Sequence, residues 1–321
     1  MKKKVICSVL LGLMVSGQLV GADYIKPKKD KKTGIFYYDL NKNGHLDIYE
    51  NPALAVEERV SALLSQMTLE EKVGQMLTSL GWPMYERQGN TIRLTEQLVR
   101  EIEEYHTGSL WGFMRADPWT QRTLTTGLTP ALAAKASNML QKYAIEHGRL
   151  GIPLFLAEEC PHGHMAIGTT VFPTSIGQAS TWNPELIRRM GSAIANEASA
   201  QGAHIGYGPV LDLARDPRWS RVEETYGEDA YLNGVMGTAL VKGFQGEFPG
   251  DKGKVIATLK HFAAYGWTEG GHNGGSAHVG NREMEEAIYP PFREAVAAGA
   301  LSVMSSYNEI DGIPCTANSD L

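Results

Sequence analysis

The sequence predicts an α/β fold of the (β/α)8 TIM-type barrel class, incomplete at its C-terminal end in this chain. From about residue 52 onward, short apolar runs alternate with helical stretches, which is the pattern of a parallel sheet covered by helices. Several of these runs end directly in polar or ionisable residues, as strands do at the active face of such a barrel. About five strands can be recognised, whereas a closed barrel has eight.

Composition and charge argue against two classes of protein. The chain has 321 residues, of which 43% are hydrophobic and 21% are charged, as is ordinary for globular proteins. Its formal net charge of −6 leaves no basic footprint, so we expect no nucleic-acid partner. Beyond the N-terminal segment no apolar stretch reaches the length of a membrane span, so we expect no membrane-spanning helix there. Nothing in the sequence indicates an oligomeric state.

Residues 1–22 have the pattern of a signal peptide. Lysines at positions 2–4 precede the apolar run 5–15, and the small residues Gly21 and Ala22 stand before Asp23. A buried N-terminal helix is the alternative interpretation. The signal peptide predicts a secreted or periplasmic protein. We expect an N-terminal extension over residues 23–54 and the barrel domain over residues 55–321.

The extension contains a twelve-residue loop, from Asp39 to Glu50, that fits the EF-hand pattern. Oxygen-bearing side chains stand at loop positions 1, 3, 5, 9 and 12, glycine (Gly44) stands at position 6, and Leu46 stands at the apolar position 8. The pattern predicts a structural calcium ion, with a polar turn that holds no metal as the alternative. The expected ligands are the side chains of Asp39, Asn41, Asn43 and Glu50, the carbonyl of His45, and Asp47 through a water molecule.

Capping signals and apolar runs predict the elements in order. Thr68-Leu-Glu-Glu71 is a capping box, and Asn183 precedes a proline at the first helical position, so each marks a helix start. Further helices are expected near residues 93–106, 129–147, 229–244 and 281–298. The expected strands are Ser109–Met114, Pro153–Ala157, Ile205–Leu213, Val255–Leu259 and Leu301–Met304.

The residues that follow these strands suggest a polar pocket. The C-terminal strand ends of a β/α barrel converge on one face, and that face holds the active site. The alternative is that these polar residues only mark the starts of loops. The groups concerned are Glu158 and Glu159, then Asp212, then Lys260 and His261, and finally the run 305–308. The residues alone therefore predict a barrel enzyme with a pocket of mixed charge.

Four long motifs resemble glycoside hydrolase family 3. They are AEECPHGH with VFPTSIGQASTWNPEL (157–186), GPVLDLARDPRWSRVEETYGEDAYL (208–232), KHFAAYG (260–266) and SVMSSYNEIDGIPCTANSDL (302–321). They occur in the order and spacing of that family, and the resemblance covers about residues 55–321. The resemblance implies a retaining, exo-acting β-glycosidase, most simply a β-glucosidase, which acts on terminal non-reducing sugars of β-linked oligosaccharides or polysaccharide-derived substrates without a catalytic cofactor.

The resemblance also implies which residues bind substrate. Glu159 stands where the family places a carboxylate on the terminal sugar, although aspartate is commoner there. Arg221 matches an arginine that hydrogen-bonds sugar hydroxyls, and the pair Lys260 and His261 matches two residues that do the same. Tyr307 matches an aromatic residue near the nucleophile. A buried ion pair with Asp212 or Glu159 is the alternative role of Lys260, and a surface pair with Glu223 or Glu224 is that of Arg221.

No catalytic residue is expected within this chain. A retaining glycosidase needs a carboxylate nucleophile and a carboxylic acid/base. The resemblance places the nucleophilic aspartate beyond Leu321 and the acid/base in a following domain. Asp320 belongs to the ANSDL stretch that precedes the intervening helix, so it is not the expected nucleophile. We therefore expect residues 23–321 alone to show no turnover.

Three other functions stay open. A β-xylosidase of the same family differs by one or two hydroxyl contacts. A β-N-acetylglucosaminidase of the family carries KHFPGHG, whereas this chain has KHFAAYG with Tyr265 at the informative position. A non-catalytic carbohydrate-binding protein would need only the hydroxyl-binding residues.

Cysteines and tryptophans complete the expectations. Cys160 and Cys315 lack a zinc-site spacing and a disulfide framework, so we expect two buried thiols. Trp182 and Trp219 could stack on a sugar, but core packing is the favoured role for each.

Overall fold

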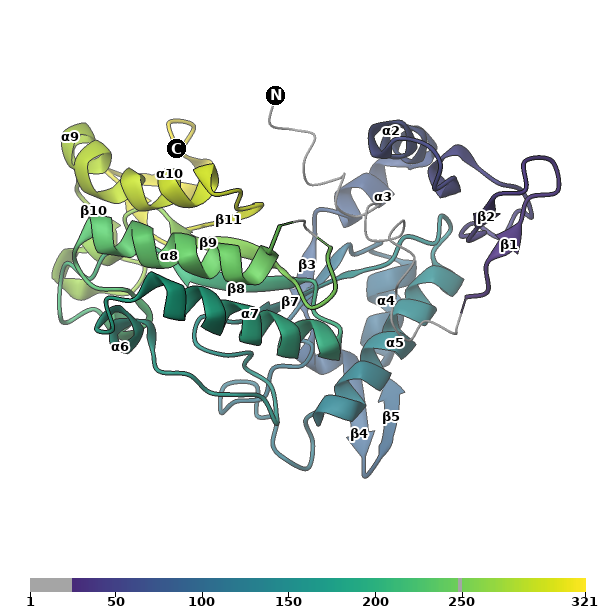
Figure 1. Ribbon diagram of the computed structural model, residues 1–321, viewed down its shortest axis with the longest axis horizontal. Helices are drawn as coiled ribbons and strands as arrows, with labels where there is room; N and C mark the ends of the chain where they lie inside the picture. The colour runs from purple at the N-terminus through teal and green to yellow at the C-terminus, as the bar shows by residue number, and fades with distance from the viewer. Residues whose placement is uncertain (1–24, 248–249) are drawn as a thin grey trace. The chain divides into compact units, whose positions relative to one another are not determined.

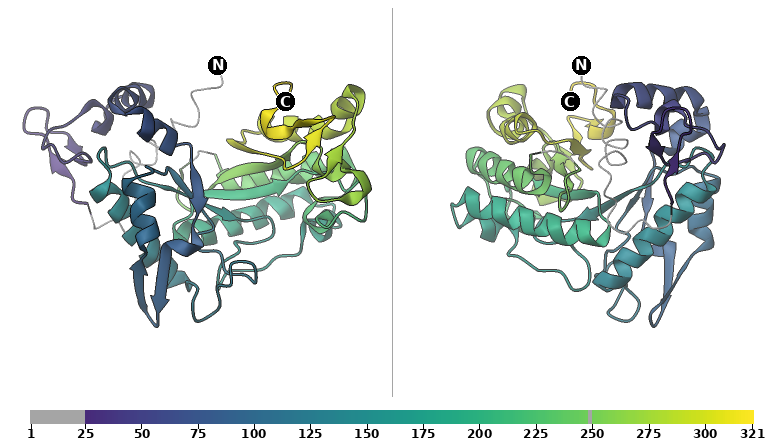
Figure 2. Two further views of the ribbon diagram at one scale, coloured as in Figure 1. Left: turned by 180° about the vertical axis from the view of Figure 1, so that it is seen from behind. Right: turned by 45° about the vertical axis from the view of Figure 1, so that its right-hand side comes forward.

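The computed structural model describes residues 25–247 and 250–321 as an α/β protein with two compact units (Figures 1 and 2). The first unit contains the described residues up to 158, together with 166–168 and 200–203. The second contains 159–165, 169–199 and the described residues from 204 to 321. The predicted signal peptide lies outside the described residues. No helix in the described ranges is long and apolar enough to cross a membrane.

The first unit contains three parallel strands. β6 (Ser109–Trp111) is hydrogen-bonded to β3 (Thr78–Leu80) on one side and to β7 (Phe155–Glu159) on the other. β3 was not among the predicted strands, because it is only three residues long and lacks a buried apolar run. The other elements are α2 (Val56–Gln66), α3 (Leu69–Gly74), β4 (Tyr85–Gln88), β5 (Thr91–Leu94), α4 (Glu96–Glu103) and α5 (Pro130–His147). The capping box at the start of α3 is confirmed, since the Thr68 side chain accepts from the backbone of Glu71.

Residues 28–50 belong to the same core as α2 and α5. β1 (Lys28–Lys29) pairs with β2 (Phe36–Tyr37), and a 3-10 turn, η1 (Ile48–Glu50), follows. One apolar cluster joins this segment to the two helices through Leu40, Tyr49, Leu63, Met67, Ile145 and Leu150. Gly151, with φ +59°, allows close packing here, because a Cβ at that position would lie 2.4 Å from the Leu40 carbonyl oxygen.

The second unit also contains three parallel strands. β9 (Ile256–Phe262) is hydrogen-bonded to β8 (Ile205–Val210) and to β11 (Ser302–Ser305). α8 (Ala230–Gln245) packs on β8 and β9 and against α10 (Tyr289–Ala297), as Figure 1 shows. The predicted α/β class with parallel strands and alternating helices is therefore confirmed, and the strands are those of an incomplete (β/α)8 barrel.

Helix boundaries in the second unit follow local chemistry. α7 (Pro184–Gln201) begins after Asn183, whose Oδ1 accepts the backbone N–H of Leu186 at 3.1 Å, as predicted. The helix predicted over 281–298 is instead α9 (Asn281–Glu283), a π-helical turn η6 (Met284–Ile288) and α10. The first turn of α10 contains two prolines, which have no N–H to donate into an uninterrupted α-helix. The remaining elements are α6 (Ser175–Ala179), η3 (Val222–Glu224), η4 (Tyr265–Trp267), η5 (Glu269–Gly271), β10 (Ser276–Ala277), β12 (Glu309–Ile310), β13 (Ile313–Pro314) and η7 (Cys315–Ala317).

Both cysteines of the described chain are buried. Cys160 and Cys315 form no disulfide with described residues, as predicted. Trp219 is also buried, which agrees with the predicted core packing. The same prediction is wrong for Trp182, which is 73% exposed and has φ +50°, at the turn between α6 and α7.

Candidate functional site

Lys260 and His261 lie near the C-terminal end of β9, and both side chains are almost fully buried. Lys260 Nζ lies 2.6 Å from Oε2 of Glu159, the last residue of β7. It also lies 5.9 Å from the centroid of the Tyr207 ring. The ion pair weighed as the alternative role of Lys260 is therefore formed with Glu159. It uses one of the three donors of the ammonium group, and the other two remain for a ligand.

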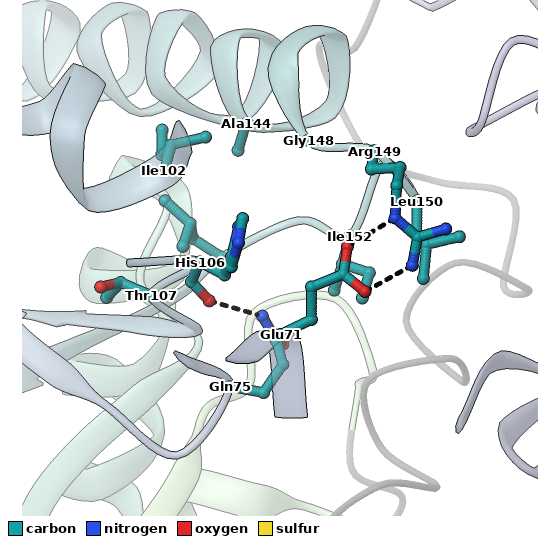
Figure 3. A pocket seen from close by; sticks show the side chains of 11 residues that line it. Glu71, Gln75, Ile102, His106, Thr107, Ala144, Gly148, Arg149, Leu150 and Ile152 are labelled. Carbon is teal, nitrogen blue, oxygen red and sulfur yellow. Dashed lines mark hydrogen bonds and ion pairs between the residues drawn. The ribbon is translucent and has the colours of Figure 1, made fainter. Parts of the chain in front are cut away.

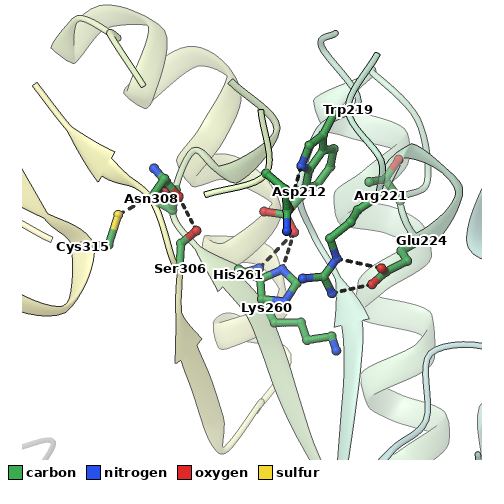
Figure 4. Close-up of polar contacts among 12 residues, drawn as sticks. Asp212, Trp219, Arg221, Glu224, Lys260, His261, Ser306, Asn308 and Cys315 are labelled. Atoms are coloured by element: carbon green, nitrogen blue, oxygen red, sulfur yellow. Dashed lines mark hydrogen bonds and ion pairs between the residues drawn. The ribbon is translucent and has the colours of Figure 1, made fainter. Parts of the chain in front are cut away.

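His261 is held by Asp212, which is the second residue after the end of β8. Asp212 Oδ2 lies 2.6 Å from His261 Nδ1 and also accepts the His261 backbone N–H at 3.2 Å (Figure 4). Burial lowers the pKa of His261, and this effect outweighs the opposite effect of Asp212. The imidazole is therefore neutral near pH 7. With Nδ1–H donating to the carboxylate, Nε2 becomes a hydrogen-bond acceptor.

Arg221 forms a two-point ion pair with Glu224 across η3. Its Nε and Nη2 atoms lie 2.7 Å and 2.6 Å from the two carboxylate oxygens (Figure 4). Burial acts to lower the pKa of Arg221, but the Glu224 carboxylate outweighs it, so the pKa is raised and the guanidinium stays charged. Both side chains are 20% exposed, so the pair is partly buried rather than a surface pair. The alternative role of Arg221, a surface pair with Glu223 or Glu224, is thus correct in the partner, Glu224, but not in the exposure of the pair.

Aromatic rings connect these two pairs. The Tyr265 ring centroid lies 5.0 Å from that of His261, and the Arg221 guanidinium lies 5.3 Å from the Tyr265 centroid. Tyr307 is 74% exposed, and its ring lies 6.4 Å from His261 and 5.8 Å from Tyr265. The buried Trp219 packs edge-to-face on Tyr265, with ring centroids 5.1 Å apart, and its Nε1 donates to Asn273 Oδ1 at 3.3 Å.

Tyr307 is positioned by the residues on either side of it. Ser306 and Asn308 are both buried, and the Ser306 hydroxyl is hydrogen-bonded to Asn308 Oδ1. Asn308 Nδ2 donates to the carbonyl of Ala263 at 3.3 Å, and the Cys315 thiol donates to the same carbonyl at 3.6 Å (Figure 4). The turn after β11 is therefore fixed against the turn after β9, and Tyr307 is exposed between the two buried residues Ser306 and Asn308.

All five residues expected to bind substrate lie in the second unit, linked by these contacts. They are Glu159, Arg221, Lys260, His261 and Tyr307. Sequence reasoning named Asp212 as a polar strand-end residue and a possible partner of Lys260, Glu224 only as a possible partner of Arg221, and Tyr265 only as a marker of substrate type. Their positions at strand ends and inside the 208–232 and 260–266 motifs were the available signal. The resulting group contains fixed cations, fixed carboxylates, one neutral imidazole and an exposed aromatic face.

Another pocket, of about 40 Å³, lies in the first unit and is separate from this chemistry. Residues of α3, α4 and α5 line it, and the Glu71–Arg149 ion pair, at 2.5 Å, lies at its side (Figure 3). Gln75 Nε2 donates to the His106 carbonyl at 3.1 Å within the same lining. The volume has room for a few water molecules at most, so we assign this pocket a structural role.

The loop from Asp39 to Glu50 folds around its own polar groups. Asp47 Oδ2 accepts from the side-chain amides of Asn41 and Asn43, each at 2.6 Å. Glu50 accepts the Leu40 backbone N–H at 2.6 Å. Asp39 Oδ2 accepts from Lys28 and from the Gly44 backbone, while Asp39 Oδ1 is buried without a hydrogen-bond partner in the described chain.

This geometry bears on the predicted calcium ion. Within the described ranges, no three His, Cys, Asp or Glu side chains converge as a metal-binding group. The donor set still fits calcium chemically, because the loop supplies carboxylate, amide and carbonyl oxygens and one buried carboxylate oxygen lacks a partner. Binding would require the Asn41 and Asn43 amides and the Lys28 ammonium to release the carboxylates. The calcium ion stays a prediction.

Comparisons with known proteins agree with one another. Residues 68–321 match the Glycosyl hydrolase family 3 N terminal domain. The chain is 33% identical to a periplasmic β-glucosidase of Salmonella typhimurium over 278 residues, which covers 85% of this chain and 32% of that protein. It is 43% identical to a β-xylosidase of Formosa agariphila over 205 residues, which covers 61% of this chain and 28% of that protein.

Solved structures give the same result. A β-glucosidase of Erythrobacter marinus superposes with a TM-score of 0.73 at 31% identity, covering 86% of this chain and 35% of that one. A β-glucosidase of Listeria innocua in complex with glucose superposes with a TM-score of 0.67 at 34% identity, covering 81% of this chain and 34% of that one. The chain thus spans about a third of the length of the relatives that it matches.

Proposed function

Because this chain belongs to glycosyl hydrolase family 3, we propose that its polar site binds the terminal non-reducing sugar of a β-linked glycoside, for hydrolysis by the whole protein. The observation that supports this best is the linked arrangement of Lys260, His261 and Arg221, each fixed by a carboxylate. A sugar hydroxyl both donates and accepts, so it needs donors and acceptors at fixed positions. Lys260 and Arg221 supply charged donors, and His261 Nε2 supplies an acceptor.

The carboxylate partners strengthen this proposal. Glu159 holds Lys260 and can accept a hydroxyl hydrogen through its second oxygen, since its side chain is 12% exposed. Charge-assisted hydrogen bonds of this kind are about twice as strong as neutral ones. They can tighten further as the sugar ring flattens toward an oxocarbenium-like transition state. Tyr307 offers an exposed ring face beside them for the apolar face of the sugar.

The proposed substrate class is β-glucosides. A β-glucosidase of Salmonella typhimurium and a glucose-bound β-glucosidase of Listeria innocua are both similar to this chain over four fifths of its length or more. The second candidate is a β-xyloside, which the β-xylosidase of Formosa agariphila at 43% identity favours. Comparing kcat/KM of the complete protein on aryl β-glucoside and aryl β-xyloside decides between them.

A retaining mechanism is part of the proposal. NMR tests it by identifying the anomer of the sugar that is released first.

A secreted or periplasmic location also belongs to the proposal. One similar protein, that of Salmonella typhimurium, is periplasmic by name. Residues 1–22 supply the sequence pattern of a signal peptide. Fractionation of cells expressing the full coding sequence tests this, with the N-terminus of the mature protein read by mass spectrometry.

Substitution in the complete protein tests the site. We expect Lys260→Ala and Arg221→Ala to lower kcat/KM about ten- to a hundredfold, because a hydrogen bond to a charged group contributes roughly 1.5–3 kcal/mol. Lys254→Ala is the matched control, since Lys254 is a partly buried lysine that bonds Ser192 and Gly243 away from the site. Folded Lys260→Ala and Arg221→Ala enzymes with unchanged kcat/KM and a lower melting temperature would leave both residues only a structural role.

A further inference from the structure

Three tryptophans of the first unit form one partly exposed cluster, here called the tryptophan platform: Trp82, Trp111 and Trp119. Their ring centroids lie 5.7 Å (Trp82–Trp111), 4.8 Å (Trp82–Trp119) and 5.5 Å (Trp111–Trp119) apart. Trp119 is 58% exposed, while the other two are partly buried. Large indoles gathered at a surface are unusual unless they meet a ligand or partner.

The platform is built on the ends of two parallel strands. Trp111 is the last residue of β6, and Trp82 follows the neighbouring strand β3 by two positions. The C-terminal strand ends are the face of a barrel that carries ligand sites. Gly112, with φ +70°, lets the Trp82 ring approach the backbone, because a Cβ there would lie 3.3 Å from the ring. The positions of Trp82 and Trp111 are therefore set by the strand ends and by the backbone at Gly112.

The third tryptophan is held by a hydrogen-bonded turn. Asp117 Oδ1 accepts the Thr120 backbone N–H at 2.8 Å, and Thr120 Oγ1 accepts the Asp117 backbone N–H at 3.1 Å. Trp119 stands within this closed turn, so its ring is presented by a rigid segment. A preformed aromatic surface loses little conformational freedom when a ligand binds.

An arginine places charge beside the rings. The Arg115 guanidinium lies 4.8 Å from the Trp119 centroid and 5.4 Å from that of Trp111. Its Nε donates to Asp117 Oδ2 at 2.6 Å, and both side chains are only 14% exposed. Within the described chain, the Nη groups of Arg115 make no hydrogen bond to protein. Two nitrogen groups of the guanidinium therefore lie next to the exposed Trp119 and have capacity for a ligand.

We propose that the tryptophan platform is a second carbohydrate-binding site, which binds pyranose units along a β-linked polysaccharide. Equatorial substituents leave a β-linked pyranose with a flat face of C–H groups, which packs on an indole ring, and with hydroxyls at its rim that accept from Arg115. All residues of the proposed site belong to the first unit. The choice of carbohydrate over another ligand rests on the proposed function.

Affinity electrophoresis of the complete protein tests this site apart from hydrolysis. Gels contain soluble mixed-linkage β-glucan, xylan or no polysaccharide. Polymers present few chain ends to an exo-acting pocket, so retardation reports a site that binds along the chain. We expect wild type to be retarded by at least one polymer. We expect Trp119→Ala to raise the dissociation constant at least tenfold and Trp119→Phe to restore most of the binding. Tyr231→Ala is the control, since Tyr231 is a 74% exposed aromatic residue on α8.

The outcomes separate the two proposals. Wild type that is not retarded by any polymer, or Trp119→Ala that is retarded like wild type, overturns the platform. Retardation lost equally in Tyr231→Ala overturns it as well. Circular dichroism and the melting temperature of Trp119→Ala identify a folding defect. In that case the retardation of Trp119→Phe is compared with that of Tyr231→Ala, and this comparison decides the outcome. If wild type is retarded but hydrolyses no aryl β-glycoside, the proposed hydrolysis fails while the platform stands.

Discussion

At the scale of single residues, three carboxylates fix the positions of the side chains that are proposed to bind sugar. Glu224 holds both Nε and Nη2 of Arg221, and the pKa of Glu224 is lowered because the Arg221 pair outweighs the effect of burial. Glu159 holds Lys260, and Asp212 holds His261 in one ring orientation. Each proposed contact of Arg221, Lys260 and His261 with the sugar therefore depends on a carboxylate partner, and of these partners only Glu159 is itself proposed to bind the sugar.

Glu224→Gln measures this dependence. The amide cannot form a charged two-point pair, so we expect the Arg221 guanidinium to become mobile and kcat/KM to fall about tenfold, while the protein stays folded. The adjacent Glu223→Gln is the control, because Glu223 is exposed and forms no ion pair with described residues. Steady-state kinetics on one aryl β-glycoside compares the two. Equal effects of both substitutions on kcat/KM would show that the loss does not come from the position of Arg221.

At the scale of elements, the loop from Asp39 to Glu50 can be tested for calcium directly. We expect one ion per chain by elemental analysis, and a melting temperature that rises with added calcium, because Tyr49 ties the loop to the core of α2 and α5. Lys28→Gln should raise the affinity, since the Lys28 ammonium forms an ion pair with Asp39 that competes with a metal ion.

Glu50→Gln should abolish the calcium response, whereas Glu57→Gln, on the exposed side of α2, should keep it. If calcium titration of the wild type releases no heat of binding and calcium does not change its melting temperature, the loop is a polar turn closed by its own amides.

Elements whose sequence contains an apolar run could be predicted, and those without such a run could not. β8, β9 and β11 were expected because their apolar runs end in polar groups, although no residue of β11 is buried. β3 escaped prediction because its sequence, Thr-Ser-Leu, contains only one apolar residue. The hairpin of β4 and β5 escaped because its strands are rich in charged residues, although the Gly89-Asn90 turn is a recognisable signal. The site residues came from motifs, whereas the pairing of Asp212 with His261, 49 positions away, needs the folded sheet.

At the scale of the whole molecule, buried histidines make stability depend on pH. Burial lowers the pKa of His164 and of His204 to about 4, and it lowers the pKa of His261 as well. The unfolded chain binds these protons more tightly than the folded one. The stability that neutral histidines contribute is therefore present above the unfolded pKa of about 6.5 and is lost as pH falls below it.

We expect the free energy of unfolding to fall by on the order of 2 kcal/mol for each strongly shifted histidine between pH 7 and pH 5. Chemical denaturation at the two pH values measures it. His164→Asn should flatten the dependence, whereas His272→Asn should not, because His272 is exposed. A pH dependence unchanged in His164→Asn would assign the acid sensitivity to other groups.

The Arg221–Glu224 and Lys260–Glu159 pairs have a consequence for how a sugar is recognised. Lysine and arginine side chains each lose up to about 2 kcal/mol of rotamer freedom when they are immobilised. Here that loss occurs during folding, because both cations are already clamped before any ligand arrives. A sugar therefore meets a stereochemical template rather than an adaptable surface. An epimer with one inverted hydroxyl leaves a charged donor facing the wrong atom, and the donor can follow the hydroxyl only by breaking its ion pair.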